Sequence, residues 1–174
     1  MQIYNVHFPL FTPGALVAPT GGVTTGSVYA GIVFPGTNRS WLLLEIDAEG
    51  SASASAPGVF SFFRTITTAA VGALTTVVTP QPIDSLATAP VFSGSAGQGT
   101  FATTQPTLAG NAIHSFGLNA NGQRYFWRAN PNLNNAIVVP GTATALLGGL
   151  GLVQVTATGT SAMAITVRLQ IAEL

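Results

Sequence analysis

The stretch AMAITVRLQIAEL, from Ala162 to Leu174, decides the fold class of this chain. Apolar side chains occupy one set of alternate positions, namely Met163, Ile165, Val167, Leu169 and Ile171. Smaller or polar side chains occupy the other set, namely Ala164, Thr166, Arg168, Gln170 and Ala172. Because successive side chains of an extended strand point to opposite faces, this period of two predicts one half-buried antiparallel strand with the first set toward the core.

Strand patterns recur over most of the chain, whereas helix patterns are almost absent. Gly, Pro, Thr and Val dominate, and no long window repeats apolar residues at helical spacing. We expect roughly eight to ten short strands. The clearest are residues 27–34, 40–47, 59–66, 71–79, 111–118, 123–129, 150–158 and 162–174.

Three turn sequences predict hairpins between neighbouring strands. They are Pro35-Gly36-Thr37-Asn38, Asn119-Ala120-Asn121-Gly122 and Gly159-Thr160-Ser161. The Asn-Gly pair in the second is a strong short-range hairpin signal. Residues 48–58, rich in Ser and Ala, are expected to form a flexible loop. Residues 85–110 are expected to form a long excursion with one or two weak strands, of the kind that often contacts a partner.

These patterns predict an all-β protein, an antiparallel β-sandwich and specifically a jelly roll, because no repeat period suggests a propeller. Residues 23–174 are expected to form a single domain, and residues 1–22 an extended N-terminal arm interrupted by prolines. The apolar residues of the arm are candidates for contacts with a neighbouring subunit: Tyr4, Phe8, Leu10 and Phe11. A first edge strand followed by a loop is an alternative for the same segment.

The scarcity of charge is the strongest compositional anomaly. Only 6% of the 174 residues are charged, where about 25% is usual, and the formal net charge is zero. The five basic residues are all arginines spread along the chain, so they form no basic stripe for nucleic acid. A free monomer normally keeps its net charge away from zero, and interface cores are poor in ions. We therefore predict a surface largely covered by partners. A secreted, Thr-rich surface domain is the alternative.

Little in the sequence supports chemistry, and no cofactor is expected. Cysteine is absent, which removes thiol nucleophiles and thiolate metal sites. Glu45, Asp47 and Glu49 alternate along a strand and could together bind a cation, but a solvated strand end is the favoured interpretation, so no metal site is predicted. His114-Ser115 and His7 are the only material for a base and a nucleophile. A partly buried His114 with one hydrogen bond is favoured, so no catalytic residue is predicted and the protein is not expected to be an enzyme.

The segment Arg124-Tyr125-Phe126-Trp127-Arg128 is the densest functional candidate. Alternation places Tyr125 and Trp127 on one face of a strand, and the other three residues on the opposite face. Tyr125 and Trp127 are candidates for stacking on a glycan or for an interface, although a tryptophan in the core is the favoured interpretation.

A membrane location is not expected. The most apolar window, residues 136–155, contains Pro140 and four glycines, which suit strands and turns better than a membrane helix. The N-terminus lacks the basic region and continuous apolar stretch of a secretory signal.

Two regions resemble small virion structural proteins of tailed bacteriophages. The first is WLLLEI at Trp41 to Ile46, followed by a small-residue loop and FSFFRTI at Phe60 to Ile66. The second is an RYFW strand, the IVVPG turn at Ile137 to Gly141, a Gly-Leu strand and a final strand closing on Glu173-Leu174. The resemblance covers residues 40–79 and 111–174; the usual Asn-Pro-x-Gly of the first turn is Asp47-Ala48-Glu49-Gly50 here.

The resemblance implies a capsid-decorating or cement protein that binds neighbouring major capsid subunits and itself, as a trimer or other small homo-oligomer. It implies a place on the outer surface of the capsid or tail of a virion assembled in the host cytoplasm. A tail or fibre module that binds a host receptor or glycan is the alternative. Neither function includes direct contact with nucleic acid or a membrane.

Overall fold

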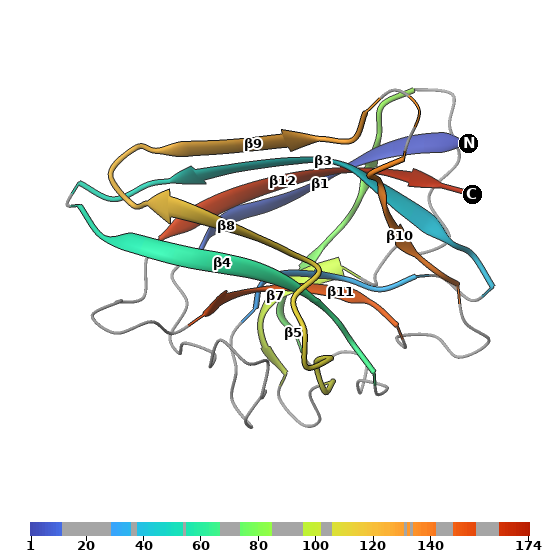
Figure 1. The fold of residues 1–174 in the computed structure, drawn as a ribbon, viewed down its shortest axis with the longest axis horizontal. Coiled ribbons are helices and arrows are strands. Elements are labelled where there is room, and N and C mark those ends of the chain that lie inside the picture. Colours follow the sequence, from blue (N-terminus) through green and yellow to red (C-terminus); the bar gives the residue numbers. More distant parts are fainter. Residues whose placement is uncertain are drawn as a thin grey trace.

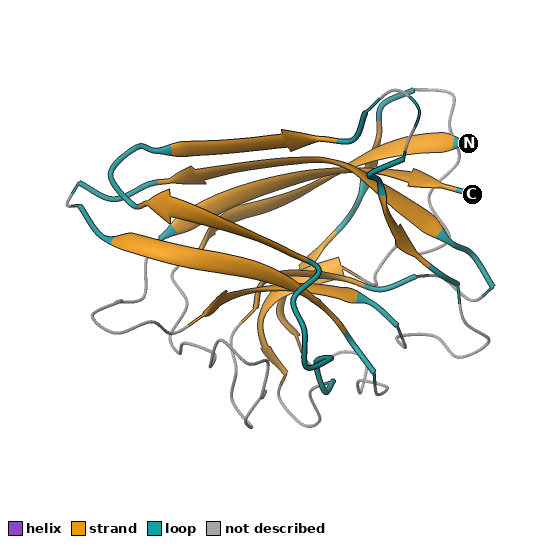
Figure 2. Ribbon diagram, viewed as in Figure 1, coloured by secondary structure: helices purple, strands orange, loops and turns teal. Residues whose placement is uncertain are grey.

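The computed structural model describes residues 1–11, 29–35, 38–53, 55–66, 74–84, 96–101, 106–130, 132, 134–141, 148–155 and 164–174. These residues form strands and loops without a helix, and therefore without a helix that could cross a membrane (Figure 2). Two antiparallel six-stranded sheets pack face to face (Figure 1). The predicted all-β class and β-sandwich are confirmed.

The first sheet runs in the order β10 (Ile137–Val139), β3 (Trp41–Gly50), β12 (Ile165–Glu173), β1 (Gln2–Phe11) and β6 (Gln81–Pro82), with β9 (Arg124–Arg128) also paired to β3. The second sheet runs in the order β5 (Leu74–Val78), β7 (Ala96–Phe101), β2 (Tyr29–Val33), β11 (Leu150–Val155), β4 (Pro57–Arg64) and β8 (His114–Asn119). Strand β7 confirms that the excursion predicted for residues 85–110 contains a strand.

The first half of the chain pairs with the second half in reverse order. β1 pairs with β12, β2 with β11, β3 with β10 and β9, and β4 with β8. Among the described strands, no two that are consecutive in the chain are hydrogen-bonded to each other. The three predicted hairpins are therefore wrong, because β2 and β3, β8 and β9, and β11 and β12 each lie in different sheets.

The turn between β8 and β9 shows why local signals misled. Gly122 has a φ of 67°, which glycine adopts readily, but Asn121 lacks the positive φ that an Asn-Gly hairpin turn also needs. The turn nevertheless binds the segment that follows β3, since Ala52 N donates to Ala120 O at 2.8 Å and Ala120 N donates to Ala56 O at 3.0 Å. The side chain of Asn119 also accepts a hydrogen bond from Ala56 N at 3.1 Å. A turn does lie at the predicted position. It connects strands of different sheets, and its hydrogen bonds go to residues 52 and 56.

The prediction of an N-terminal arm is corrected for residues 2–11. β1 pairs with β12 from Gln2 to Phe8 and again at Phe11. Alternation turns Tyr4 and Phe8 inward, where both are fully buried, so neither can serve as an exposed contact for a neighbour. The side chains of Leu10 and Phe11, and residues 12–22, lie outside the described part of the chain.

A side chain from the second sheet supports the open edge of β1. β6 pairs only with Tyr4 and Asn5, so Pro9 lies beyond it, in an edge position that proline tolerates. The buried amide of Gln98 donates to Pro9 O at 2.9 Å and to Ala30 O at 3.1 Å. The Gln98 side chain thus supplies a hydrogen-bond donor to the Pro9 carbonyl at the edge of the first sheet.

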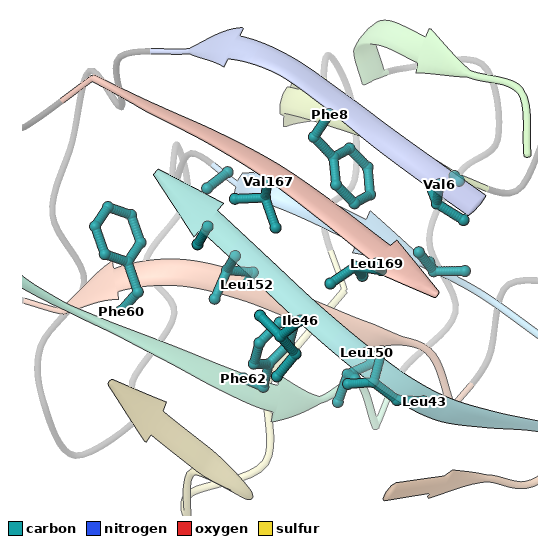
Figure 3. Close-up of a cluster of buried hydrophobic side chains, with 14 of the residues drawn as sticks. Val6, Phe8, Leu43, Ile46, Phe60, Phe62, Leu150, Leu152, Val167 and Leu169 are labelled. Atoms are coloured by element: carbon teal, nitrogen blue, oxygen red, sulfur yellow. The ribbon is translucent and has the colours of Figure 1, made fainter. Parts of the chain in front are cut away.

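The main core lies between the sheets and is built from alternate residues of both. Figure 3 shows inward side chains from β1, β3, β4, β11 and β12: Val6, Phe8, Leu43, Ile46, Phe60, Phe62, Leu150, Leu152, Val167 and Leu169. On β12, the odd-numbered side chains from Ile165 to Ile171 are buried, as the sequence predicts. Met163 lies outside the described residues.

A β-bulge reverses the phase of β3. Glu45 lies opposite Gln170, but Leu43 lies opposite Ile171, so Leu44 is an extra residue on β3. Regular alternation would place Leu42, Leu44 and Ile46 on one face, and the bulge interrupts that alternation. The main core contains four β3 residues on both sides of the bulge: Trp41, Leu43, Ile46 and Ala48. The bulge thus leaves Glu45 and Asp47 on the outer face.

The second sheet carries a separate apolar cluster on its outer face. This outer cluster comprises Tyr29, Ile32, Phe34, Phe63, Leu108, Val153 and Val155, all buried. Alternation separates it from the main core, since Phe62 belongs to one and Phe63 to the other. Residues 106–109 lie beside it, where Tyr29 donates through its hydroxyl to Pro106 O at 3.3 Å and Ala109 N donates to Arg64 O at 2.7 Å.

Candidate functional site

The outer face of the first sheet gathers five of the ten charged residues of the chain (five basic and five acidic in all). We call Glu45, Asp47, Arg124, Arg128 and Arg168 the ionic cluster. β3 supplies the two carboxylates, and it lies between β9 and β12, which supply the three guanidinium groups. The register places Arg128 opposite Glu45 and Arg168 opposite Asp47. Cross-strand neighbours on one face are close enough for direct ion pairing.

Each carboxylate of the cluster contacts two arginines. Arg124 forms a bidentate contact with Asp47, in which Nε donates to Oδ1 at 2.6 Å and Nη2 donates to Oδ2 at 2.8 Å. Arg168 Nη2 bridges the two acids, at 3.0 Å from Asp47 Oδ2 and 3.1 Å from Glu45 Oε1. Arg128 Nε completes the cluster at 3.2 Å from Glu45 Oε2. Two-point contacts of this kind fix geometry as well as charge.

The acids of the cluster are more covered than the bases. The side chains of Glu45 and Asp47 are 7% and 15% exposed, whereas those of Arg124 and Arg128 are 59% and 65% exposed. The hydrogen bond from Arg124, together with the charges of Arg124 and Arg168, holds the pKa of Asp47 below its ordinary value, although burial acts in the opposite direction. The hydrogen bond to Asp47 in turn raises the pKa of Arg124.

The ionic cluster changes two interpretations of the sequence. The five arginines are spread along the sequence, yet three of them meet two carboxylates on one face. Glu45 and Asp47 were expected at a solvated strand end or at a cation site, but arginines occupy their oxygens. Among the described residues, no group of three His, Asp or Glu side chains is placed to hold a metal ion. Alternation in the sequence predicted that the side chains of Arg124, Arg128 and Arg168 point outward. It did not predict which strands pair.

A polar hollow adjoins the cluster on the same face. Its lining comes from β1, β3 and β12: His7, Asp47, Glu49, Thr166, Val167 and Arg168. His7 is exposed and lies opposite Arg168 across the β1–β12 ladder. Thr166 Oγ1 donates to Glu49 O at 3.4 Å, which ties two walls of the hollow together. The hollow therefore combines acceptors and donors at the centre of the sheet face.

Tyr125 and Trp127 lie on the inner side of β9, as alternation predicts, and both are partly buried against the main core. Tyr125 stacks on Phe116 of β8 with ring centroids 4.3 Å apart and planes inclined by 7°. The ring of His114 lies 5.4 Å from that of Trp127. These four rings close the side of the sandwich between β8 and β9, so Tyr125 and Trp127 do not form an exposed stacking platform.

His114 is partly buried, as expected, and its Nε2 forms a hydrogen bond of 2.7 Å with the Tyr125 hydroxyl. Burial lowers the pKa of His114 and raises the pKa of Tyr125. Ser115 points to the opposite face of β8, where its hydroxyl lies 2.7 Å from that of Ser61. The neighbouring pair His114-Ser115 therefore does not bring a base to a nucleophile.

Comparisons with known proteins identify no family. No protein-family model matches the chain, and no curated protein matches it. A chain of the KBV activated particle at acidic pH is similar across the whole length of this chain and 69% of its own, with a TM-score of 0.33 and 9% identity. A chain of the heated full particle of Israeli acute paralysis virus is also similar across the whole length of this chain and 68% of its own, with a TM-score of 0.30 and 11% identity. Likeness at this level carries no argument about function.

Proposed function

We propose that this chain is a non-enzymatic structural protein of a virion, which decorates and stabilises a bacteriophage capsid by binding neighbouring major capsid subunits. The observation that carries the proposal is the use of charge. Half of the few ions of the chain meet in the ionic cluster, where the two carboxylates offset two of the three guanidinium charges. Little charge is then left to oppose burial against neighbours.

The strand order supports the same proposal. Four strands of the first sheet follow the order β1, β12, β3 and β9, and four of the second follow β2, β11, β4 and β8. The described chain crosses from one sheet to the other at eight of the eleven steps between consecutive strands, and frequent crossing is expected when an antiparallel ribbon is rolled into a jelly roll. Viral capsid domains are among the proteins that use this architecture. The sequence resemblance to small phage virion proteins points in the same direction.

The test is to add the purified protein to capsid shells that lack it. We expect saturable binding and a rise in the melting temperature of the shell, measured by scanning calorimetry. Shells that already carry the protein are the matched control and should gain nothing. Failure to bind vacant shells, with binding to host cells instead, would exclude decoration.

A tail or fibre module that binds a host glycan is the second candidate, favoured by the polar hollow on the first sheet. Its carboxylates, guanidinium group and threonine hydroxyl are suited to hydrogen bonding with sugar hydroxyls. Under this alternative, glycan binding in calorimetric titrations should disappear in Glu49→Gln and His7→Ala, but persist in Asp84→Asn outside the hollow. Loss in all three variants, or in none, would count against the hollow as a glycan site.

A further inference from the structure

Strand β9 forms a lateral edge of the first sheet. β3 pairs with one side of it, and no described strand pairs with the other side. Figure 1 shows β9 at the upper boundary of the described fold. An open strand edge presents backbone N–H and C=O groups that can pair with another strand.

Two hydrogen bonds just beyond the ends of β9 fix the phase of its ladder with β3. Gly50 N donates to Gln123 O at 3.0 Å, and Ala129 N donates to Leu44 O at 2.7 Å. Both pairs continue the register of the β3–β9 ladder. In an antiparallel ladder, hydrogen-bonded pairs alternate with pairs that exchange no bond.

The alternation decides which groups of β9 remain available. Tyr125 and Trp127 turn their backbone N–H and C=O groups toward β3. Arg124, Phe126 and Arg128 therefore direct theirs away from β3, toward the open edge. The side chains of these three residues lie on the outer face, and that of Phe126 is 52% exposed.

The residues of this edge are complementary to themselves. Arg-Tyr-Phe-Trp-Arg has the same kinds of side chain when read in either direction from Phe126. Antiparallel pairing with a second copy therefore sets Phe126 against its counterpart, and Arg124 against Arg128. Each of these pairs falls on positions whose N–H and C=O groups point outward, so every outward group of the edge gains a partner.

Repulsion between the arginines of the two edges is weaker than it would be for arginines without carboxylate partners. Charged side chains on an edge strand commonly prevent association. Here Asp47 binds Arg124 through two hydrogen bonds, and Glu45 pairs with Arg128. Both acids also contact Arg168, so they offset two of the three guanidinium charges. Two such edges would bring arginines that are already paired with carboxylates together around a central pair of phenylalanine rings, a favourable cross-strand combination.

We propose that β9 pairs antiparallel with β9 of a second copy of this chain across a two-fold axis at Phe126. The pairing joins two first sheets into one continuous sheet. This contact does not depend on the proposed function, and a dimer is one form of the trimer or other small homo-oligomer expected from the sequence. A five-residue pairing is small, so the contact is weak in dilute solution and gains strength where copies are held close together.

The absence of cysteine permits a register-specific test. Directly opposed residues of a hydrogen-bonded pair lie about 5.5 Å apart at Cα, within disulfide range. We expect Phe126→Cys to form a disulfide-linked dimer under mild oxidation. Arg124→Cys is the matched control on the same edge, because position 124 and its own counterpart are about 13 Å apart in this register. Equal cross-linking of the two variants, or none in either, would overturn the proposal.

A second measurement uses proline as a probe of the edge. Phe126→Pro removes the outward N–H and the exposed ring of Phe126, the two features that the proposed contact uses, and it removes no donor of the ladder with β3. Sedimentation velocity over a concentration series should show association in the native chain and in Arg39→Met, but not in Phe126→Pro. If Phe126→Pro fails to fold, the cysteine pair still decides. A native chain that stays monomeric at every concentration contradicts the proposal.

Discussion

The outer faces of the two sheets are stabilised in opposite ways. On the first sheet the outer face is polar, and its ionic cluster lies partly exposed around β3. On the second sheet the outer cluster is apolar and buried, with Phe63 at 0% exposure. Exposed ion pairs contribute little to stability, whereas buried aromatic side chains contribute much. Because both sheets share the main core, the difference lies in the outer faces. The outer face of the second sheet should contribute more to stability than that of the first, and the outer face of the first sheet should carry most of the charge that a partner or a change of pH can affect.

The largest effect should come from Phe63→Ala. Removing a fully buried phenylalanine leaves a cavity and should lower the free energy of unfolding by about 3–5 kcal/mol. Phe126→Ala is the matched control on the outer face of the first sheet, and should change stability by less than about 0.5 kcal/mol at concentrations where the chain is monomeric. Urea denaturation of both variants measures the difference. Similar losses would show that the two faces are not distinct.

A smaller effect should come from Arg168→Met, which removes the one guanidinium group shared by both acids of the cluster. Glu45 and Asp47 each keep one arginine, and Arg168 is itself 44% exposed, so we expect a loss of about 1–2 kcal/mol. The loss should shrink in high salt, because screening weakens the native pairs. Arg39→Met, at an exposed position outside the cluster, serves as control. A larger loss than in Phe63→Ala would reverse the comparison.

The ionic cluster should also make stability depend on acid. The folded pKa of Asp47 is lowered, so its contribution is present above the ordinary value of 3.8 and is lost as the pH falls through and below that value. The free energy of unfolding should therefore fall on acidification through this range. Asp47→Asn should show a shallower fall, whereas Phe63→Ala should keep the native slope. Parallel slopes in the native chain and Asp47→Asn would contradict the assignment.

The smallest effect should come from Glu49→Gln. Glu49 shares the outer face with Glu45 and Asp47, but it is exposed and outside the ionic cluster. We expect a change below about 0.5 kcal/mol in urea denaturation. Glu45→Gln is the informative contrast, since Glu45 is buried between two arginines and should cost more. Equal effects would mean that alternate spacing on β3, and not pairing, sets the contribution of these acids.

Which way a side chain points was largely predictable from the sequence, since it depends on local alternation. Arg168 faces outward on β12, and Trp127 faces inward on β9, as expected. The exception is β3, where the extra residue Leu44 shifts the phase. A bulge is fixed by the strand opposite it, and nothing in the β3 sequence marks the position.

Which strands pair was not predictable, because every turn signal was local and every described pairing is between strands that are not consecutive. The Asn121-Gly122 turn was found, but its strands enter different sheets. The ionic cluster was missed for this reason alone. Its carboxylates and arginines were all recognised and given faces, yet β3, β9 and β12 come together only in the folded chain.

The place of β12 has a consequence for synthesis. β12 lies between β1 and β3 in the first sheet, although both of those strands precede it by most of the chain. On a translating ribosome, β1 and β3 emerge early. Neither can form its hydrogen-bonded ladder with β12 until β12 has also emerged. The nascent chain therefore cannot complete the first sheet, the ionic cluster or the hollow until β12 has left the exit tunnel.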